Sequence, residues 1–125
     1  MKLEHVNITV SDAKASASTL MDIFDWHIRW EGASMGEGYT VHVGDRESYL
    51  ALYSPAKALG QAGEKYTVEG SINHVGVVVS DLKAVEAKVL EAGFKPHSHY
   101  DYEPGDRFYF NGPDGVEYEV VSYDD

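Results

Sequence analysis

The chain has 125 residues, of which 25% are charged and 43% hydrophobic, as is typical of one soluble globular domain. Its formal net charge of −11 argues against nucleic acid and anionic membranes as partners, because both repel an acidic protein. There is no cysteine, so a metal ion would have to be bound by histidine and carboxylate side chains. The N-terminal region lacks the basic start and apolar core of a secretory signal, and no apolar run reaches the roughly 20 residues that span a bilayer. We therefore expect a cytoplasmic protein.

The first half of the chain opens with a predicted strand over residues 6–10, which is rich in β-branched side chains. Ser11 follows as the expected N-cap of a helix, with Asp12 near the positive end of the helix dipole. The helix carries an apolar stripe made of Ala13, Ala17, Leu20 and Phe24. Three more strands are predicted, over residues 26–30, 39–43 and 49–53.

The second half predicts the same elements in the same order. A strand over residues 75–79 leads to Ser80 as N-cap and to a helix that ends at Gly93, a plausible C′ glycine. Three strands follow, over residues 94–100, 107–110 and 117–121, with turn residues at 113–115 before the last. His97 and His99 lie two apart in a predicted strand, so we expect them to share one face of an exposed polar edge.

An internal repeat explains this symmetry. His5 and His74 are 69 residues apart, as are Ser11 and Ser80. The repeat predicts an α+β fold in which two βαβββ modules form a curved, largely antiparallel mixed sheet around a cleft. We expect one domain over residues 1–125, with module 1 at about 1–53 and module 2 at about 71–125. Residues 54–70 are predicted to be a linker, and an inert connection is favoured over a mobile flap.

The repeat also predicts a metal site. Alternate side chains of a strand share a face, and aligning the last strands of the two halves pairs Ala51 with Glu119. The candidate ligands are therefore His5, His74 and Glu119, with Ala51 facing them. The competing interpretation is a pair of hydrogen-bonded histidines in a protein that has lost its metal.

The paired βαβββ repeat, the histidine near the start of each half and the Pro113-Asp114-Gly115 turn before Glu119 resemble the vicinal oxygen chelate superfamily. That family includes glyoxalase I, fosfomycin-resistance thiol transferases, extradiol dioxygenases and bleomycin-resistance proteins. The resemblance implies that metal ligands occur at the positions matched by His5, Ala51, His74 and Glu119, of which alanine cannot coordinate. Two histidines and one carboxylate suit divalent Fe, Mn, Co, Ni or Zn.

Alanine at position 51 separates this chain from typical glyoxalase I enzymes. The resemblance places their proton-transferring base among the ligating carboxylates, and alanine cannot exchange a proton. Glu119 remains as the candidate catalytic residue. Three-ligand relatives include the fosfomycin thiol transferases, which resemble this chain in ligand types and over residues 105–110. Extradiol dioxygenases share the ligand types but are usually longer.

Four further side chains are predicted to contact a substrate: Asn7, Tyr49, Tyr53 and Arg107. The first three share a strand face with His5 or Ala51, and a cation at Arg107 suits a substrate carboxylate or phosphonate. We expect a metal-dependent enzyme that acts on a small oxygen-bearing molecule by Lewis-acid catalysis. The alternative is a non-catalytic protein of the bleomycin-resistance type that sequesters a small aromatic or cationic compound. A homodimer is expected in either case.

Overall fold

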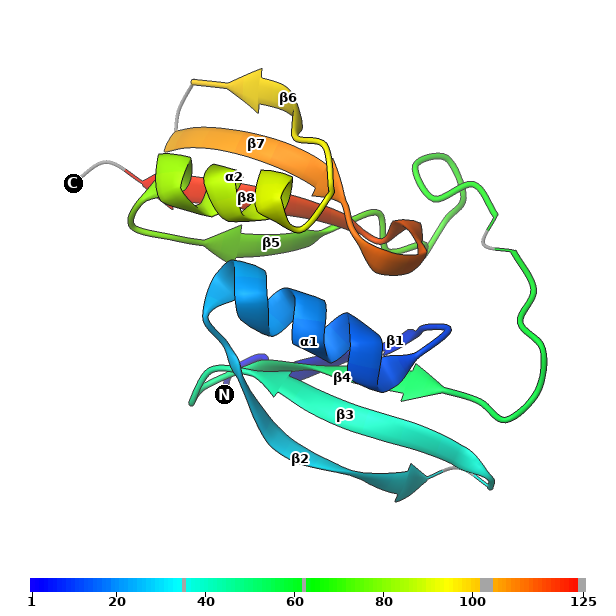
Figure 1. Cartoon of the computed structure of the whole chain (residues 1–125). Coiled ribbons are helices and arrows are strands. Elements are labelled where there is room, and N and C mark those ends of the chain that lie inside the picture. The colour runs from blue at the N-terminus through cyan, green and yellow to red at the C-terminus, as the bar shows by residue number, and fades with distance from the viewer. Residues whose placement is uncertain (35, 62, 102–104, 124–125) are drawn as a thin grey trace. The chain divides into compact units, whose positions relative to one another are not determined.

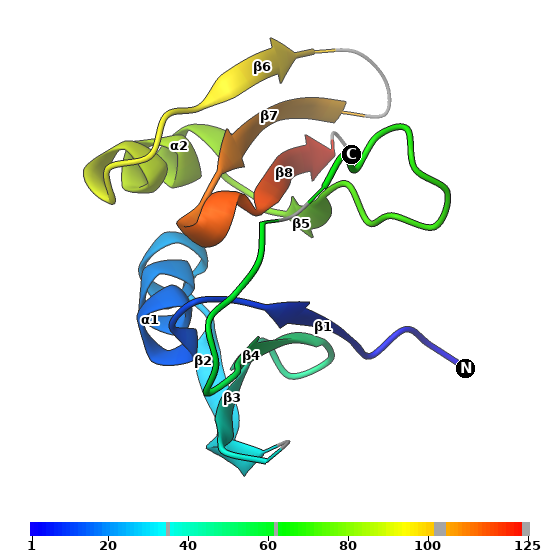
Figure 2. The same ribbon diagram turned by 90° about the vertical axis from the view of Figure 1, so that its right-hand side faces the viewer.

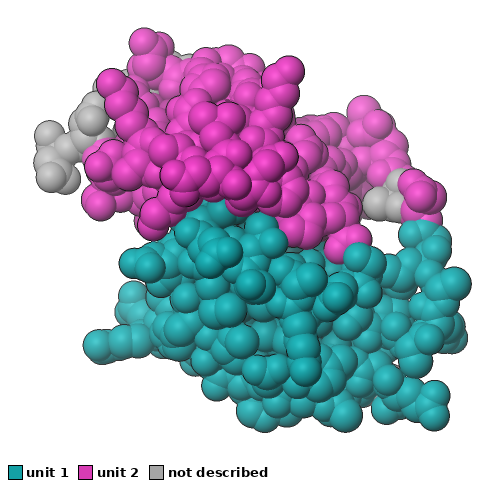
Figure 3. Space-filling model, in the orientation of Figure 1, with its two compact units in different colours: residues 1–60 teal, residues 61–125 magenta. Residues whose placement is uncertain are grey.

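A computed structural model describes residues 1–34, 36–61, 63–101 and 105–123. The chain divides into two compact units, Met1–Gly60 and Gln61–Asp125 (Figure 3). The two predicted modules fall in different units. Each unit is described by itself below.

Unit 1 contains one helix and four strands, which form a single mixed sheet (Figure 1). The sheet order is β1-β4-β3-β2, in which β1 is parallel to β4 and the other neighbours are antiparallel. The elements are β1 (His5–Thr9), α1 (Ala13–Phe24), β2 (His27–Ser34), β3 (Gly38–Gly44) and β4 (Tyr49–Ser54).

Unit 2 repeats this topology with the strand order β5-β8-β7-β6 and the same pattern of parallel and antiparallel pairs. The predicted α+β class and the two βαβββ modules are therefore confirmed, with one four-stranded sheet in each unit. The elements are β5 (Val75–Val78), α2 (Leu82–Glu91), β6 (His97–Tyr100), β7 (Gly105–Asn111), a 3₁₀ turn (Pro113–Gly115) and β8 (Glu117–Tyr123).

Each helix covers one side of its own sheet (Figure 2). In unit 1 the core joins the buried stripe of α1 to the inward side chains of the strands: Val10, Ala13, Ala17, Leu20, Ile23, Val41, Val43, Leu50 and Leu52. In unit 2 the core contains Val77, Val89, Phe108, Phe110, Tyr118 and Val120. Strand alternation directs the intervening side chains, Glu119 among them, to the face without the helix.

The helix caps differ from the prediction by one residue. Asp12, not Ser11, is the N-cap of α1, and its carboxylate accepts the backbone N–H of Ala15 at 3.0 Å. Asp81, not Ser80, caps α2 through the N–H of Ala84 at 3.1 Å. Serine and aspartate are both good N-caps, so the sequence could not show which of the two neighbouring residues caps each helix.

The C-terminus of α2 is as predicted. Gly93 has a positive φ of 91°, which glycine adopts without steric cost. Its N–H bonds the carbonyl of Leu90, and the N–H of Phe94 bonds the carbonyl of Val89, which together make a Schellman motif. No helix in the described parts of the chain is long and apolar enough to cross a membrane.

The prediction that His97 and His99 share a face is wrong. His97 stacks on Tyr109, whereas His99 stacks on Phe108. These two β7 residues are adjacent in the strand and therefore point to opposite faces. The cause is Ser98, whose φ of 56° breaks the strand alternation where the register of β6 against β7 shifts.

Candidate functional site

The strand registers place Ala51 and Glu119 at equivalent positions of the two sheets. In unit 1, Asn7 of β1 is paired with Ala51 of β4. In unit 2, Gly76 of β5, which is 69 residues after Asn7, is paired with Glu119 of β8. This confirms the alignment of the two last strands, and with it the observation that only one module has a carboxylate at this position.

Unit 2 brings together His74, Glu119 and Arg107. The Nε2 atom of His74 lies 3.1 Å from Oε1 of Glu119, and Nη1 of Arg107 donates to Oε2 at 2.7 Å. The side chains of Arg107 and Glu119 are only 12% and 13% exposed, so solvent screens this ion pair weakly. Both carboxylate oxygens are thus engaged, each by a different partner.

The tautomer of His74 follows from its surroundings. Its Nδ1 atom is buried and has no hydrogen-bond partner among the described residues. A proton on Nδ1 would be unsatisfied, so the neutral ring is best protonated on Nε2, from which it donates to Glu119. A ligating histidine usually donates its other ring N–H to an acceptor, and His74 has no such acceptor within the described structure.

Tyr109 completes the surroundings of this pair and was not predicted from the sequence. It lies directly opposite Glu119 in the β7–β8 register, and its ring meets that of His74 edge-on at 5.6 Å. His97 stacks on the same tyrosine, and its Nε2 lies 3.0 Å from Oδ1 of Asn111. Strand alternation from Arg107 would have placed Tyr109 on this face, since the two residues are two positions apart.

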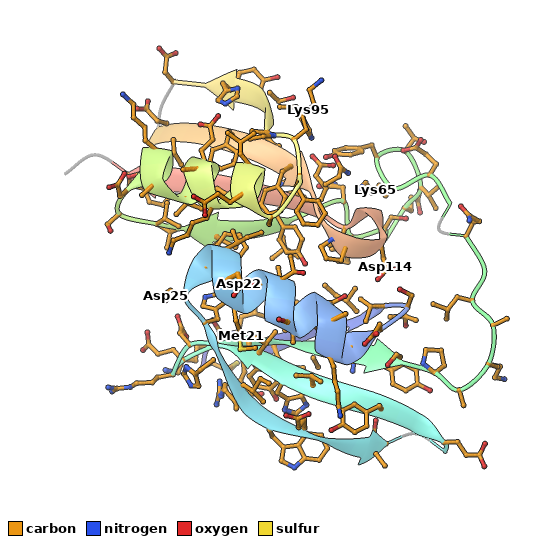
Figure 4. The ribbon with its side chains drawn as sticks, viewed as in Figure 1. Met21, Asp22, Asp25, Lys65, Lys95 and Asp114 are labelled. Atoms are coloured by element: carbon orange, nitrogen blue, oxygen red, sulfur yellow. The ribbon has the colours of Figure 1, made fainter. Side chains whose placement is uncertain are left out.

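The segment before β5 contacts the same sheet. The Tyr66 hydroxyl donates to Oε1 of Glu117 at 2.7 Å, and Nζ of Lys65 lies 3.4 Å from the same oxygen. Figure 4 shows Lys65 on this segment and Asp114 at the 3₁₀ turn before β8. The hydrogen bond to the Glu117 carboxylate raises the pKa of Tyr66 to about 12. No sequence pattern pointed to this contact.

Unit 1 holds His5 in a group of aromatic rings. The His5 ring stacks on Tyr49 at 4.9 Å, and Tyr49 in turn stacks on His42 at 4.5 Å. Nδ1 of His5 lies 2.8 Å from Oε1 of Glu4, and this hydrogen bond lowers the pKa of the Glu4 carboxyl. The Trp30 ring lies 5.1 Å from that of His42. His42 is partly desolvated, which lowers the pKa of its imidazole.

The remaining predicted residues of unit 1 lie on the same sheet face as His5. Asn7 is beside Ala51, and Thr9 is beside Tyr53 in the β1–β4 register. Ala51 is buried, and its neighbour in β3 is His42. Ala51, the equivalent of Glu119, is therefore paired with the imidazole of His42, whereas Glu119 is paired with Tyr109.

Unit 2 places two possible metal-ligand atoms side by side, while no group of three or more His, Asp or Glu side chains that could hold an ion is found among the described residues. Two ligand atoms at about 2.1 Å from one ion and at right angles to each other lie about 3.0 Å apart. The separation of 3.1 Å between Nε2 of His74 and Oε1 of Glu119 is close to this value, and it is also the length of the hydrogen bond described above, which an ion would have to replace. An imidazole and a carboxylate also suit the metals that the sequence predicts. His5 belongs to unit 1, so its role as third ligand stays a prediction.

Residues 2–120 match the Glyoxalase/Bleomycin resistance protein/Dioxygenase superfamily, and the chain belongs to this superfamily. No curated protein sequence matches the chain. The family predicted from the repeat is thus confirmed over nearly the whole length.

Several solved structures share the fold. A glyoxylase/bleomycin resistance protein/dioxygenase domain from Frankia sp. EAN1pec is 17% identical, with a TM-score of 0.83 over 99% of this chain and 98% of the other. The fosfomycin resistance protein FosX from Mesorhizobium loti is also 17% identical, with a TM-score of 0.71 over 96% and 90%. FosX from Listeria monocytogenes, complexed with Mn(II) and sulfate ion, is 12% identical, with a TM-score of 0.72 over 98% and 93%.

Proposed function

We propose that this protein is a metal-dependent enzyme that acts on a small oxygen-bearing substrate. The observation that carries the proposal is the 3.1 Å approach of the His74 imidazole to the Glu119 carboxylate. These two side chains are the first two proposed ligands. The internal repeat makes His5 the counterpart of His74, so His5 is the proposed third ligand. A structure of the Listeria FosX protein, which shares this fold, contains Mn(II), and this supports a metal ion in the proposal.

When bound, the ion supplies a Lewis acid that polarises substrate oxygen atoms. The chain's own residues provide position and selectivity. Arg107 fixes the orientation of Glu119 through Oε2 and leaves Oε1 for the ion. Asn7, Tyr49 and Tyr53 are the proposed substrate contacts, because they belong to the strand face that carries His5.

The absence of a second carboxylate restricts the reaction. Glu119 is the only acidic side chain at the two equivalent strand positions, so one carboxylate would have to hold the ion and also move the proton. It is therefore better suited to hold an ion than to carry a proton between two carbon atoms. Addition to, or opening of, a polarised oxygen-bearing group fits this site better than isomerisation of a hemithioacetal.

The second candidate function is metal-free binding of an aromatic or cationic compound. Two observations favour it: Arg107 already supplies a cation to Glu119, and Nδ1 of His74 lacks an acceptor among the described residues. In unit 1 the rings of Trp30, His42 and Tyr49 form an aromatic group, although the guanidinium of Arg29 already lies 4.6 Å from the centre of the Tyr49 ring.

Metal content tests the first proposal. Protein purified without added metal or chelator should contain about one divalent ion per chain, measured by inductively coupled plasma mass spectrometry. His74→Ala should lose at least tenfold in affinity, because it removes one of three ligands. His99→Ala is the matched control, since His99 also lies against a carboxylate, 2.8 Å from Glu86. Unchanged metal content in His74→Ala would contradict the ligand assignment.

A further inference from the structure

We infer that Arg107 is a built-in cation that competes with the metal ion for Glu119 and thereby sets the metal affinity of the site. The inference rests on the proposed function only in its choice of Glu119 as a ligand. The guanidinium is held 2.7 Å from Oε2 of that carboxylate, with both side chains largely buried. Charges that are withdrawn from solvent interact more strongly than surface charges.

The guanidinium is fixed from a second side. Its Nε and Nη2 atoms both donate to the carbonyl oxygen of Gly105, each at 3.3 Å, so the same residue is held by its own strand and by β8. Gly105 itself permits the close approach of β7 to β8, because a Cβ atom there would lie only 2.3 Å from the carbonyl oxygen of Ser122. Arg107 is therefore positioned before any ion arrives.

Two consequences follow for an ion at Glu119. First, Oε2 is occupied, so the carboxylate can offer only Oε1 and cannot chelate through both oxygens. Second, an ion that reaches Oε1 lies close to a fixed positive charge, which repels it. Arg107 also orients Glu119, which favours metal binding. This orientation needs only a hydrogen bond and not a positive charge. Removing the charge should therefore tighten metal binding.

The test compares three side chains at position 107. Mn²⁺ or Zn²⁺ is titrated into metal-free protein, and the dissociation constant is measured by isothermal titration calorimetry. Arg107→Gln keeps a hydrogen-bond donor without the charge and should bind the ion about tenfold more tightly, which corresponds to about 1.4 kcal/mol. Arg107→Lys keeps the charge and should stay within about threefold of the native protein. Arg46→Gln makes the same change of net charge at an exposed turn and should have no effect.

The outcomes separate this inference from the proposed function. Equal or weaker binding in Arg107→Gln than in the native protein would overturn the inference while leaving a metal-dependent enzyme intact. Binding by Arg107→Gln but not by the native protein would support the inference and overturn the metal-dependent function. Absence of binding in both would overturn both. If Arg107→Gln does not fold, as judged by circular dichroism, Arg107→Met gives a second neutral side chain for the same comparison.

Discussion

At the scale of single residues, two equivalent strand positions hold different side chains, Ala51 and Glu119. The two residues occupy the same place in two copies of one module, yet only Glu119 can accept a proton or bind a cation. The native protein should therefore show no isomerisation of the methylglyoxal–glutathione hemithioacetal in a spectrophotometric assay. Robust turnover would show that a second carboxylate is not needed.

Ala51→Glu should add a fourth ligand and tighten metal binding by about tenfold. The buried site and its neighbour His42 add a cost, because an uncompensated carboxylate there must be desolvated or pair with the imidazole. We therefore expect the variant to be less stable than the native protein without metal and to regain thermal stability as metal is added. Ala51→Gln is the control of equal size, and a metal response equal to that of the glutamate variant would argue against coordination by the new carboxylate.

The sequence predicted the equivalence of these two residues but not their neighbours. The equivalence of Ala51 and Glu119 follows from the internal repeat, which is recognised directly in the order of the residues. The neighbours Tyr109 and His42 depend on the register of adjacent strands, which turns and bulges determine. His97 and His99 illustrate the same limit, because the left-handed backbone of Ser98 reversed the expected side of one histidine.

At the scale of elements, the caps and the segment before β5 show where sequence patterns are ambiguous. A Ser-Asp pair offers two N-caps, and the structure uses the aspartate in both helices. Residues in the predicted linker lack periodicity, so nothing in their order indicated that Tyr66 would bond Glu117. The end of α2, where Gly93 is the one suitable residue, was predicted correctly.

The contact between Tyr66 and Glu117 should hold the segment against β8, two residues from Glu119. Tyr66→Phe removes the donor while keeping the ring, so backbone amides of residues 63–73 should exchange hydrogen several-fold faster, measured by mass spectrometry. Tyr39→Phe is the matched control, since the Tyr39 hydroxyl also donates to a glutamate, Glu31, at 2.7 Å in unit 1. Unchanged exchange in Tyr66→Phe would show that the hydroxyl does not hold the segment.

The same contact has a defined pH dependence. The pKa of Tyr66 is raised to about 12 in the folded protein from the ordinary tyrosine value of 10.0, so the folded state holds this proton more tightly. Its contribution to stability is fully present below pH 10 and is lost as the pH rises towards 12. Accordingly, the exchange difference between native protein and Tyr66→Phe should shrink over this interval and be largest at neutral pH.

At the scale of the whole molecule, two sheets of the same topology each direct one face towards a helix and the other towards polar and aromatic side chains. The edge strands are β1 and β2 in one sheet and β5 and β6 in the other. Such edges can pair with a second chain, so the homodimer stays a prediction that sedimentation can measure. The acidic charge of −11 opposes association with anionic partners and favours cations.

The choice between enzyme and binding protein follows from what each needs. An enzyme of the proposed type needs a coordination position that substrate can reach, so a nitrocatechol should bind to metal-loaded protein and not to metal-free protein. A sequestering protein needs only apolar contacts and charge, so a cationic aromatic dye without coordinating oxygens should bind equally well with and without metal. Both titrations can be followed by absorbance with the native protein. His74→Ala should abolish the binding of nitrocatechol and leave the binding of the dye unchanged. Tight dye binding without metal, together with no nitrocatechol response in metal-loaded protein, would contradict the enzyme and favour sequestration, because the ring surface of Trp30, His42 and Tyr49 would then be the site of function.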